Sequence, residues 1–345
     1  MKDKKIDIIA EVGNLHDGSI DKAKRLIQIS AECGADVVKF QTHIFDAESL
    51  LDAPAPDYFK QESRKDYFER TAFNAGQWKK LKLYAQECSI EFMSSVFSLE
   101  AVDLLEEVGV KRYKIPSGEV TNLSLLEKVA SLRKPVLLSS GMSSWDELDW
   151  AVDTLRSGGC EDLIVLQCTS LYPCPNDKVG LNVINEIKKR YGCRVGFSDH
   201  TLNNEASFAA IAFGVEIIER HLTLSRDHKG SDAKHSLEPD EFKQFVRQVK
   251  DGRIENVDQA FFPAVDKDKL AEELKEMKFI FEKSIVAKHD IAQGTTITFD
   301  MLAFKKPGDG IRADNYRDII GRKALQEISV NTKIDRAMLS EKRYA

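Results

Sequence analysis

The sequence predicts an α/β chain in which eight parallel strands close into a (β/α)8 barrel, followed by a small C-terminal α+β unit. Short apolar runs alternate with longer amphipathic stretches, this alternation occurs eight times, and the pattern changes after residue 253. Alternating strands and helices favour a parallel sheet. Eight such units in about 250 residues match the size of a closed barrel.

Each predicted strand is a short run of mainly apolar residues. In chain order these runs occupy 6–12, 36–41, 91–96, 112–117, 135–140, 162–168, 194–198 and 216–221. Between them, apolar residues recur at spacings of three and four, as in 21–34, which predicts amphipathic helices. The segment 42–72 is long and rich in acidic and aromatic residues. We expect a loop of this kind to cover a site.

The change of pattern divides the chain into three parts. Residues 1–253 form the predicted barrel, and 254–283 form a charged, helical connector. Residues 284–345 form a separate unit with short strands, brief helices and turns at 293–294 and 307–310. This last unit has more Lys and Arg than Asp and Glu, whereas the whole chain has a net charge of −6. Opposite charges favour docking between the two parts.

Composition excludes several classes of protein. The net charge of −6 argues against a nucleic-acid partner. The apolar runs are too short to span a membrane, and the first residues lack a secretory signal pattern, so we expect a cytoplasmic protein without membrane contact. The six cysteines form no C-x-x-C pair, which predicts free thiols rather than a zinc site or disulfides.

Polar residues end almost every predicted strand, where a barrel places its active site. Lys39 and Lys114, with hydroxyls at Ser95, Ser117, Ser139 and Ser198, suit a phosphate or carboxylate. Either lysine could instead form a Schiff base, as in an aldolase or lyase.

Two histidines and two glutamates end other strands. His200 and His221 follow adjacent strands and could bind Mn²⁺, Co²⁺ or Zn²⁺, or could be hydrogen-bonded structural residues. Glu11 and Glu119 could contact sugar hydroxyls or a water molecule. The alternative for each glutamate is a salt bridge with a barrel lysine.

Motifs along almost the whole chain resemble those of the sialic acid synthase family. The run IAEVGNLHDGS resembles the family's opening, and further signatures follow in the same order: VVKFQTH, YKIPSGE, LLSSGMS, QCTSLYPCP, GFSDHT, IERHLT and KGSDAKHSLEP. The C-terminal unit, with its KPGDGI turn, looks like the family's antifreeze-like (SAF) domain. One such motif is weakly specific, but this many in register are highly specific.

The resemblance implies a reaction and a role for each matching residue. The family condenses phosphoenolpyruvate with N-acetylmannosamine, its 6-phosphate or a related amino sugar, and phosphate leaves. A divalent metal, usually Mn²⁺ with Mg²⁺ or Co²⁺ as alternatives, would bind His200 and His221. Phosphoenolpyruvate would be held by Lys39, Ser95, Lys114, Ser117, Ser139, Ser170 and Ser198. The sugar would contact Glu11, Gln41, Tyr172 and Asp232, and Glu119 would lie beside the reacting carbons.

The sequence also departs from the family pattern. Leu15 replaces an asparagine, Ala233 replaces a histidine, and Ser95 and Ser170 replace a threonine and an asparagine of some members. Lys306 replaces an arginine that reaches the sugar in the partner subunit's site, so the charge is kept but the planar fork is lost. The resemblance implies a homodimer in which residues 284–345 cap the partner's barrel. An ice-binding or carbohydrate-binding role for this unit is disfavoured, because it lacks a repeated threonine face.

Overall fold

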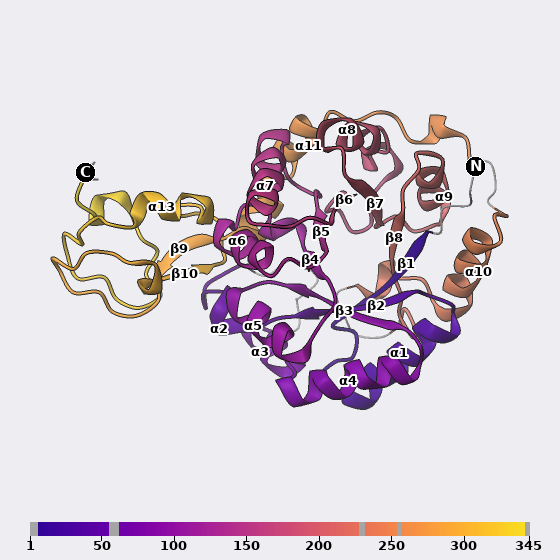
Figure 1. Cartoon of the computed structure of the whole chain (residues 1–345), viewed down its shortest axis with the longest axis horizontal. Helices are drawn as coiled ribbons and strands as arrows, with labels where there is room; N and C mark the ends of the chain where they lie inside the picture. The colour runs from indigo at the N-terminus through magenta and orange to yellow at the C-terminus, as the bar shows by residue number, and fades with distance from the viewer. Residues whose placement is uncertain (1–5, 55–61, 228–231, 254–256, 342–345) are drawn as a thin grey trace.

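The computed structural model describes residues 6–54, 62–227, 232–253 and 257–341. Its largest part is a closed barrel of eight strands in chain order (Figure 1). Each strand is parallel to its neighbours. The strands are β1 Asp7–Gly13, β2 Val37–Thr42, β3 Glu91–Val96, β4 Tyr113–Ile115, β5 Val136–Ser139, β6 Leu163–Gln167, β7 Arg194–Asp199 and β8 Ile217–His221. The predicted barrel is therefore confirmed.

The barrel interior is apolar in one layer and polar in the next. Alternate side chains of a strand point to the same face. One buried apolar cluster fills the interior: Ile9, Val37, Met93, Leu137, Ile164, Leu166 and Ile217. Two positions after most of these residues stand the buried polar side chains Glu11, Lys39, Ser95, Ser139 and Glu219, together with the buried thiol of Cys168. The strand period thus places a polar layer directly on an apolar base.

Gly196 of β7 lies inside the barrel, where a side chain would not fit. A Cβ atom added there would lie 2.4 Å from Cδ2 of Leu166 and 3.0 Å from the Ile217 backbone oxygen. The absence of a side chain at Gly196 therefore lets the larger residues of β6 and β8 fill the interior.

Helices follow the strands and cover the outside of the barrel (Figure 1). They are α1 Ile20–Glu32, α4 Ala75–Glu87, α5 Leu99–Val108, α6 Leu123–Ser131, α7 Trp145–Ser157, α8 Asn182–Tyr191, α9 Glu205–Ala212 and α10 Pro239–Lys250. Ser19, Asn74, Ser98 and Ser144 cap four of them by accepting a first-turn backbone N–H. Their apolar faces pack against the strands in the main core.

The long segment after β2 and the connector both contain short helices. The first holds α2 Phe45–Glu48 and α3 Arg64–Thr71, and the connector holds α11 Lys267–Glu273 and α12 Lys275–Phe281. Single 3-10 turns lie at η2 Ser117–Glu119, η3 Asn176–Lys178, η4 Ala233–His235, η5 Gln259–Phe261, η6 Phe299–Met301, η7 Ala313–Asn315 and η8 Arg336–Met338. Parts of both segments, 55–61 and 254–256, lie outside the described residues.

The C-terminal unit has its own small core and lies beside the barrel (Figure 1). Its strands β9 Ser284–Ala287 and β10 Leu302–Lys305 pair antiparallel, and α13 spans Tyr316–Ile319. Leu123 of α6 is part of the same buried cluster as the unit's own apolar residues. The unit is therefore packed on the barrel of its own chain.

The sequence predicts free thiols and no segment that spans a membrane. All six cysteines are free, as predicted. Among the described residues, no helix is both long enough and apolar enough to cross a membrane.

Candidate active site

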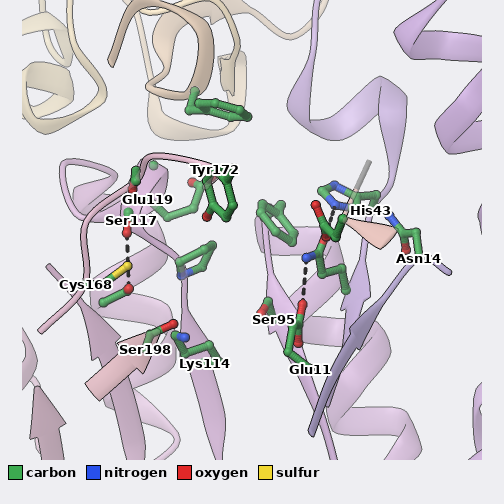
Figure 2. Close-up of a pocket in the computed structure, with 18 of the residues that line it drawn as sticks. Glu11, Asn14, His43, Ser95, Lys114, Ser117, Glu119, Cys168, Tyr172 and Ser198 are labelled. Atoms are coloured by element: carbon green, nitrogen blue, oxygen red, sulfur yellow. Dashed lines mark hydrogen bonds between the residues drawn. The ribbon is translucent and has the colours of Figure 1, made fainter. Parts of the chain in front are cut away.

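A cavity of about 140 Å³, open to solvent, lies at the carboxyl ends of the barrel strands. Figure 2 shows Glu11, Asn14, His43 and Ser95 on one side of it, and Ser117, Glu119 and Tyr172 on the other. Every site residue predicted from the sequence lines this cavity: Glu11, Lys39, Gln41, Ser95, Lys114, Ser117, Glu119, Ser139, Ser170, Tyr172, Ser198, His200, His221, Asp232 and Lys306. The structure therefore brings the whole predicted set together, and their chemical roles remain predictions.

Two lysines and two carboxylates form a buried charge cluster on the cavity floor. Lys39 Nζ lies 2.7 Å from Glu11 Oε2 and 3.5 Å from Glu219 Oε2. Lys114 Nζ donates to both carboxylate oxygens of Glu219 at 2.8 Å, and Ser198 Oγ donates to Glu219 Oε1 at 2.9 Å. The salt bridge that the sequence left open for Glu11 is thus present. A bound anion would share both lysines with these carboxylates.

Burial and pairing set the pKa values in this cluster. Burial raises the pKa of Glu11 to about 7, although Lys39 opposes the shift. Burial opposes charge on Lys39 as well, but Glu11 and Glu219 outweigh it and raise the pKa of Lys39. Burial lowers the pKa of Lys114 despite its contact with Glu219. Glu11 is therefore suited to donate or accept a hydrogen bond with a substrate hydroxyl.

Hydroxyl groups surround a glycine beside the charge cluster. Ser117 Oγ donates to Ser139 Oγ at 3.1 Å and accepts from the Gly141 backbone N–H at 3.1 Å. A Cβ atom at Gly141 would lie only 2.4 Å from both Ser117 Oγ and Ser170 Oγ. The missing side chain keeps space between hydroxyls that can donate to an anion.

His200 and His221 have ring centroids 5.4 Å apart. His200 Nδ1 is 2.8 Å from the Thr169 carbonyl oxygen, so Nδ1 carries a proton, and Nε2 has its lone pair when the ring is neutral. Burial opposes charge on this ring, but the neighbouring Cys168 thiol outweighs it and raises the pKa of His200. Burial keeps the pKa of His221 well below its usual range. Among the described residues, no group of three or more His, Cys, Asp or Glu side chains is arranged to hold a metal. Two imidazoles still fit a divalent ion whose other positions go to substrate and water.

Glu119 and the end of the connector close one side of the cavity. Asn122 Nδ2 donates to Glu119 Oε2 at 2.8 Å, and Lys283 Nζ lies 3.2 Å from Glu119 Oε1. Burial raises the pKa of Glu119. A Cβ atom at Gly118 would lie 2.8 Å from the Phe281 backbone oxygen, so the connector packs directly on this wall. The partner of Glu119 is thus a connector lysine rather than a barrel lysine.

Lys306 lies in the cavity of its own chain. Its Nζ is 3.0 Å from Glu48 Oε2, its backbone N–H donates to Glu48 O at 2.8 Å, and its carbonyl accepts from Leu50 N at 3.0 Å. The expectation that this lysine reaches the partner's site in a homodimer stays a prediction. Within the single chain, Lys306 lies at the cavity because the chain after β10 runs alongside the end of α2. A homodimer with exchanged C-terminal units stays a prediction, since the structure describes one chain.

Several cavity residues were given no role from the sequence. Leu15, which replaces an asparagine of the family pattern, is buried in the main core, while the adjacent Asn14 lines the cavity. Glu219 was visible as a strand-end carboxylate, but its pairing with two lysines was not. His43, just after β2, was visible only as part of a motif. The remaining residues without a predicted role are Arg64, Tyr67, Phe68, Phe97, Pro116, Gly118, Met142, Cys168 and Phe281.

The carboxyl ends of the strands of a (β/α)8 barrel form the active site in enzymes with this fold. Here they carry two buried lysines and several hydroxyls, which suit an anionic substrate. The chain belongs to the NeuB family, whose model matches residues 26–258, and the SAF domain model matches residues 282–340.

Similar proteins cover nearly the full chain. The N,N'-diacetyllegionaminic acid synthase of Campylobacter jejuni is 38% identical over 94% of this chain and 97% of its own length. The human N-acetylneuraminate-9-phosphate synthase is 35% identical over 95% of this chain and 90% of its own length. The crystal structure of the Bacillus subtilis spore coat polysaccharide biosynthesis protein spsE superposes with a TM-score of 0.80 at 29% identity, covering 99% of this chain and 97% of that one.

Proposed function

We propose that the chain condenses phosphoenolpyruvate with the open-chain form of an N-acylated amino sugar, giving a nine-carbon 2-keto-3-deoxy acid and phosphate. The observation that carries this proposal is the floor of the cavity. There, the buried Lys39 and Lys114 both pair with Glu219, and Lys39 also pairs with Glu11 and donates to Ser95 Oγ. Such a site can bind a small, multiply charged anion while the rest of the cavity accepts a polyhydroxylated partner.

The proposed reaction forms one carbon–carbon bond and breaks one carbon–oxygen bond. Carbon 3 of phosphoenolpyruvate bonds to the aldehyde carbon, whose oxygen gains a proton. Water adds to carbon 2, and the bond between carbon 2 and the phosphate oxygen breaks. Lys39 and Lys114 offset the substrate's charge, and the hydroxyls of Ser117 and Ser139 hold it in place. Glu11 and Gln41, joined by a 2.7 Å hydrogen bond, would contact the sugar.

His200 and His221 would hold the divalent metal, with Mn²⁺ as the proposed ion. A bound ion of this kind polarises the aldehyde oxygen as a Lewis acid. The Thr169 carbonyl supports this role, because it fixes the His200 tautomer that leaves Nε2 available.

The choice of sugar and the assembly are finer proposals. N-acetylmannosamine, its 6-phosphate and di-N-acetylated relatives are the candidate aldoses. We also propose a homodimer, as the family resemblance implies.

The test is a panel of these aldoses with phosphoenolpyruvate and Mn²⁺. We expect phosphate release only when an accepted amino sugar is present, with a product whose mass equals that of the sugar plus pyruvic acid. A Schiff-base aldolase would instead form an imine that borohydride traps on Lys39 or Lys114. An imine of this kind without phosphate release would reject the proposed function.

A further inference from the structure

His43 lies in the cavity wall, where its side chain is held by contacts on all sides. Its ring is sandwiched between Phe68 of α3 and Phe97, with both ring centroids 3.9 Å away. The interplanar angles are 20° and 23°, so the three rings are nearly parallel. The side chain is buried, and the two phenyl rings fix the plane of the imidazole.

Hydrogen bonds at both ring nitrogens fix the rotation of His43 within that plane. Nδ1 lies 2.8 Å from Glu48 Oε1, and Nε2 lies 3.2 Å from Gln41 Oε1. The other carboxylate oxygen of Glu48 pairs with Lys306 Nζ at 3.0 Å. At the opposite end, Gln41 Nε2 donates to Glu11 Oε1 at 2.7 Å. A continuous chain of polar contacts therefore runs from the C-terminal unit to Glu11.

The chemistry of these groups makes the orientation of Gln41 depend on His43. A carboxylate only accepts hydrogen bonds, so Glu48 requires a proton on Nδ1. With a second proton on Nε2, the ring donates to the Gln41 carbonyl oxygen, and the Gln41 amide nitrogen then faces Glu11. With Nε2 unprotonated, the ring would accept from the amide nitrogen and turn the Gln41 oxygen toward Glu11. Burial lowers the pKa of His43, and Glu48 opposes this shift.

We propose that His43 is a positioning residue that sets which end of the Gln41 amide faces the sugar end of the site. Lys306 of the C-terminal unit supports it by holding Glu48. This inference rests on the proposed function, because it assumes that Gln41 and Glu11 face the sugar. The unit would then act on sugar binding through Gln41, 265 positions earlier in the chain than Lys306.

Two substitutions of His43 separate positioning from simple structural support. The amide nitrogen of glutamine can take the place of Nε2 and still donate to Gln41. The amide nitrogen of asparagine can take the place of Nδ1 and reaches only Glu48. We expect His43→Asn to raise KM for the amino sugar about tenfold, as for one lost hydrogen bond. KM for phosphoenolpyruvate should stay within about twofold, and His43→Gln should recover most of the loss.

The opposite pattern would overturn the proposal. Equal effects of the two substitutions, or equal increases in KM for both substrates, would mean that His43 only supports the fold. Thermal unfolding of both variants shows whether they are folded at the assay temperature. If neither is, Gln41→Glu, which keeps one acceptor oxygen and loses the amide donor, tests the same contact. An unchanged sugar KM in that variant would also overturn the proposal.

A double substitution tests the link to the C-terminal unit. Lys306→Met and His43→Asn should each raise the sugar KM, and together should raise it by less than the product of the two, because they act through one chain of contacts. A fully multiplicative effect would remove Lys306 from the proposal. The exposed Lys288→Met, in the same unit, is the matched control for loss of a positive charge.

A measurement without turnover separates this inference from the proposed function. In protein labelled with ¹⁵N-histidine, the His43 ring signals are identified by their loss in His43→Asn. We expect these signals to shift in Lys306→Met and to stay in place in Lys288→Met. Unchanged signals in Lys306→Met would contradict the contact chain even if the enzyme is active. Failure of the aldose panel with shifted signals would reject the function but leave the chain of contacts in place.

Discussion

The floor and the rim of the cavity are built in different ways. The floor uses inward positions of the strands, where Glu11, Lys39, Lys114 and Glu219 come from four members of one closed sheet. The rim uses segments outside the sheet: His43 after β2, α3, the connector and the C-terminal unit. Strand register fixes the floor, whereas docking between separate parts of the chain fixes the rim. We therefore expect phosphoenolpyruvate to bind at the two lysines of the floor, and the sugar to extend from Glu11 toward the rim.

Glu219 is the residue whose replacement should affect the floor most. Glu219→Gln leaves two buried lysines with one fewer carboxylate, which should lower the free energy of unfolding by about 3–5 kcal/mol. Urea unfolding measures this loss. Phosphoenolpyruvate should restore part of it, because a bound anion pairs with the same lysines. A variant as stable as the wild type would show that the cluster tolerates an unpaired charge.

Removal of the metal should have the next largest effect. Chelation or His221→Ala should lower turnover by at least about 100-fold, the scale seen when a metal site is disturbed. Added Mn²⁺ or Co²⁺ should restore the chelated wild type but not the variant. Full activity of His221→Ala in the presence of a chelator would reject the two-histidine site.

Gly141→Ala should displace the hydroxyls that lie beside the charge cluster of the floor. The added methyl group meets Ser117 Oγ and Ser170 Oγ at 2.4 Å, so the serines must move. We expect a cost of about 1–3 kcal/mol, as for overpacking, expressed mainly as a higher KM for phosphoenolpyruvate. A change confined to the KM for the sugar would place these serines at the rim instead.

Co-expression of two inactive chains, His221→Ala and Lys306→Glu, tests which chain completes the rim. If the C-terminal units are exchanged, one site in a mixed dimer combines an intact barrel with an intact Lys306, so activity should rise above that of the separate variants. Activity no higher than that of the separate variants would show that each C-terminal unit completes the site of its own chain, because each site in the mixed dimer would then keep one defect. The readout is phosphate release from the purified mixed dimer.

The sequence predicts which residues line the floor of the cavity, but it does not predict the contacts of the rim. The strand period of two places Lys39 two residues after Val37 and Ser95 two residues after Met93, so the inward positions follow once a strand is recognised. The pairing of Glu219 with Lys114 depends on the register around the closed barrel, which no single strand specifies.

The contact between Glu48 and Lys306 joins residues far apart in the sequence. Neither residue lies in a repeating pattern that marks it as buried, yet both side chains are almost completely buried. Only the docking of the C-terminal unit on the segment after β2 brings them together. The sequence therefore places Lys306 at a cavity only through the family resemblance.

Phosphoenolpyruvate affinity in two lysine variants tests the division between floor and rim most directly. Calorimetry without sugar should show that Lys114→Ala loses about 1.5–3 kcal/mol of binding free energy, as for a charge-assisted contact. Lys306→Met should bind phosphoenolpyruvate with the affinity of the wild type, because its lysine is paired with Glu48 at the rim. Equal losses in the two variants, or unchanged affinity in Lys114→Ala, would contradict the account.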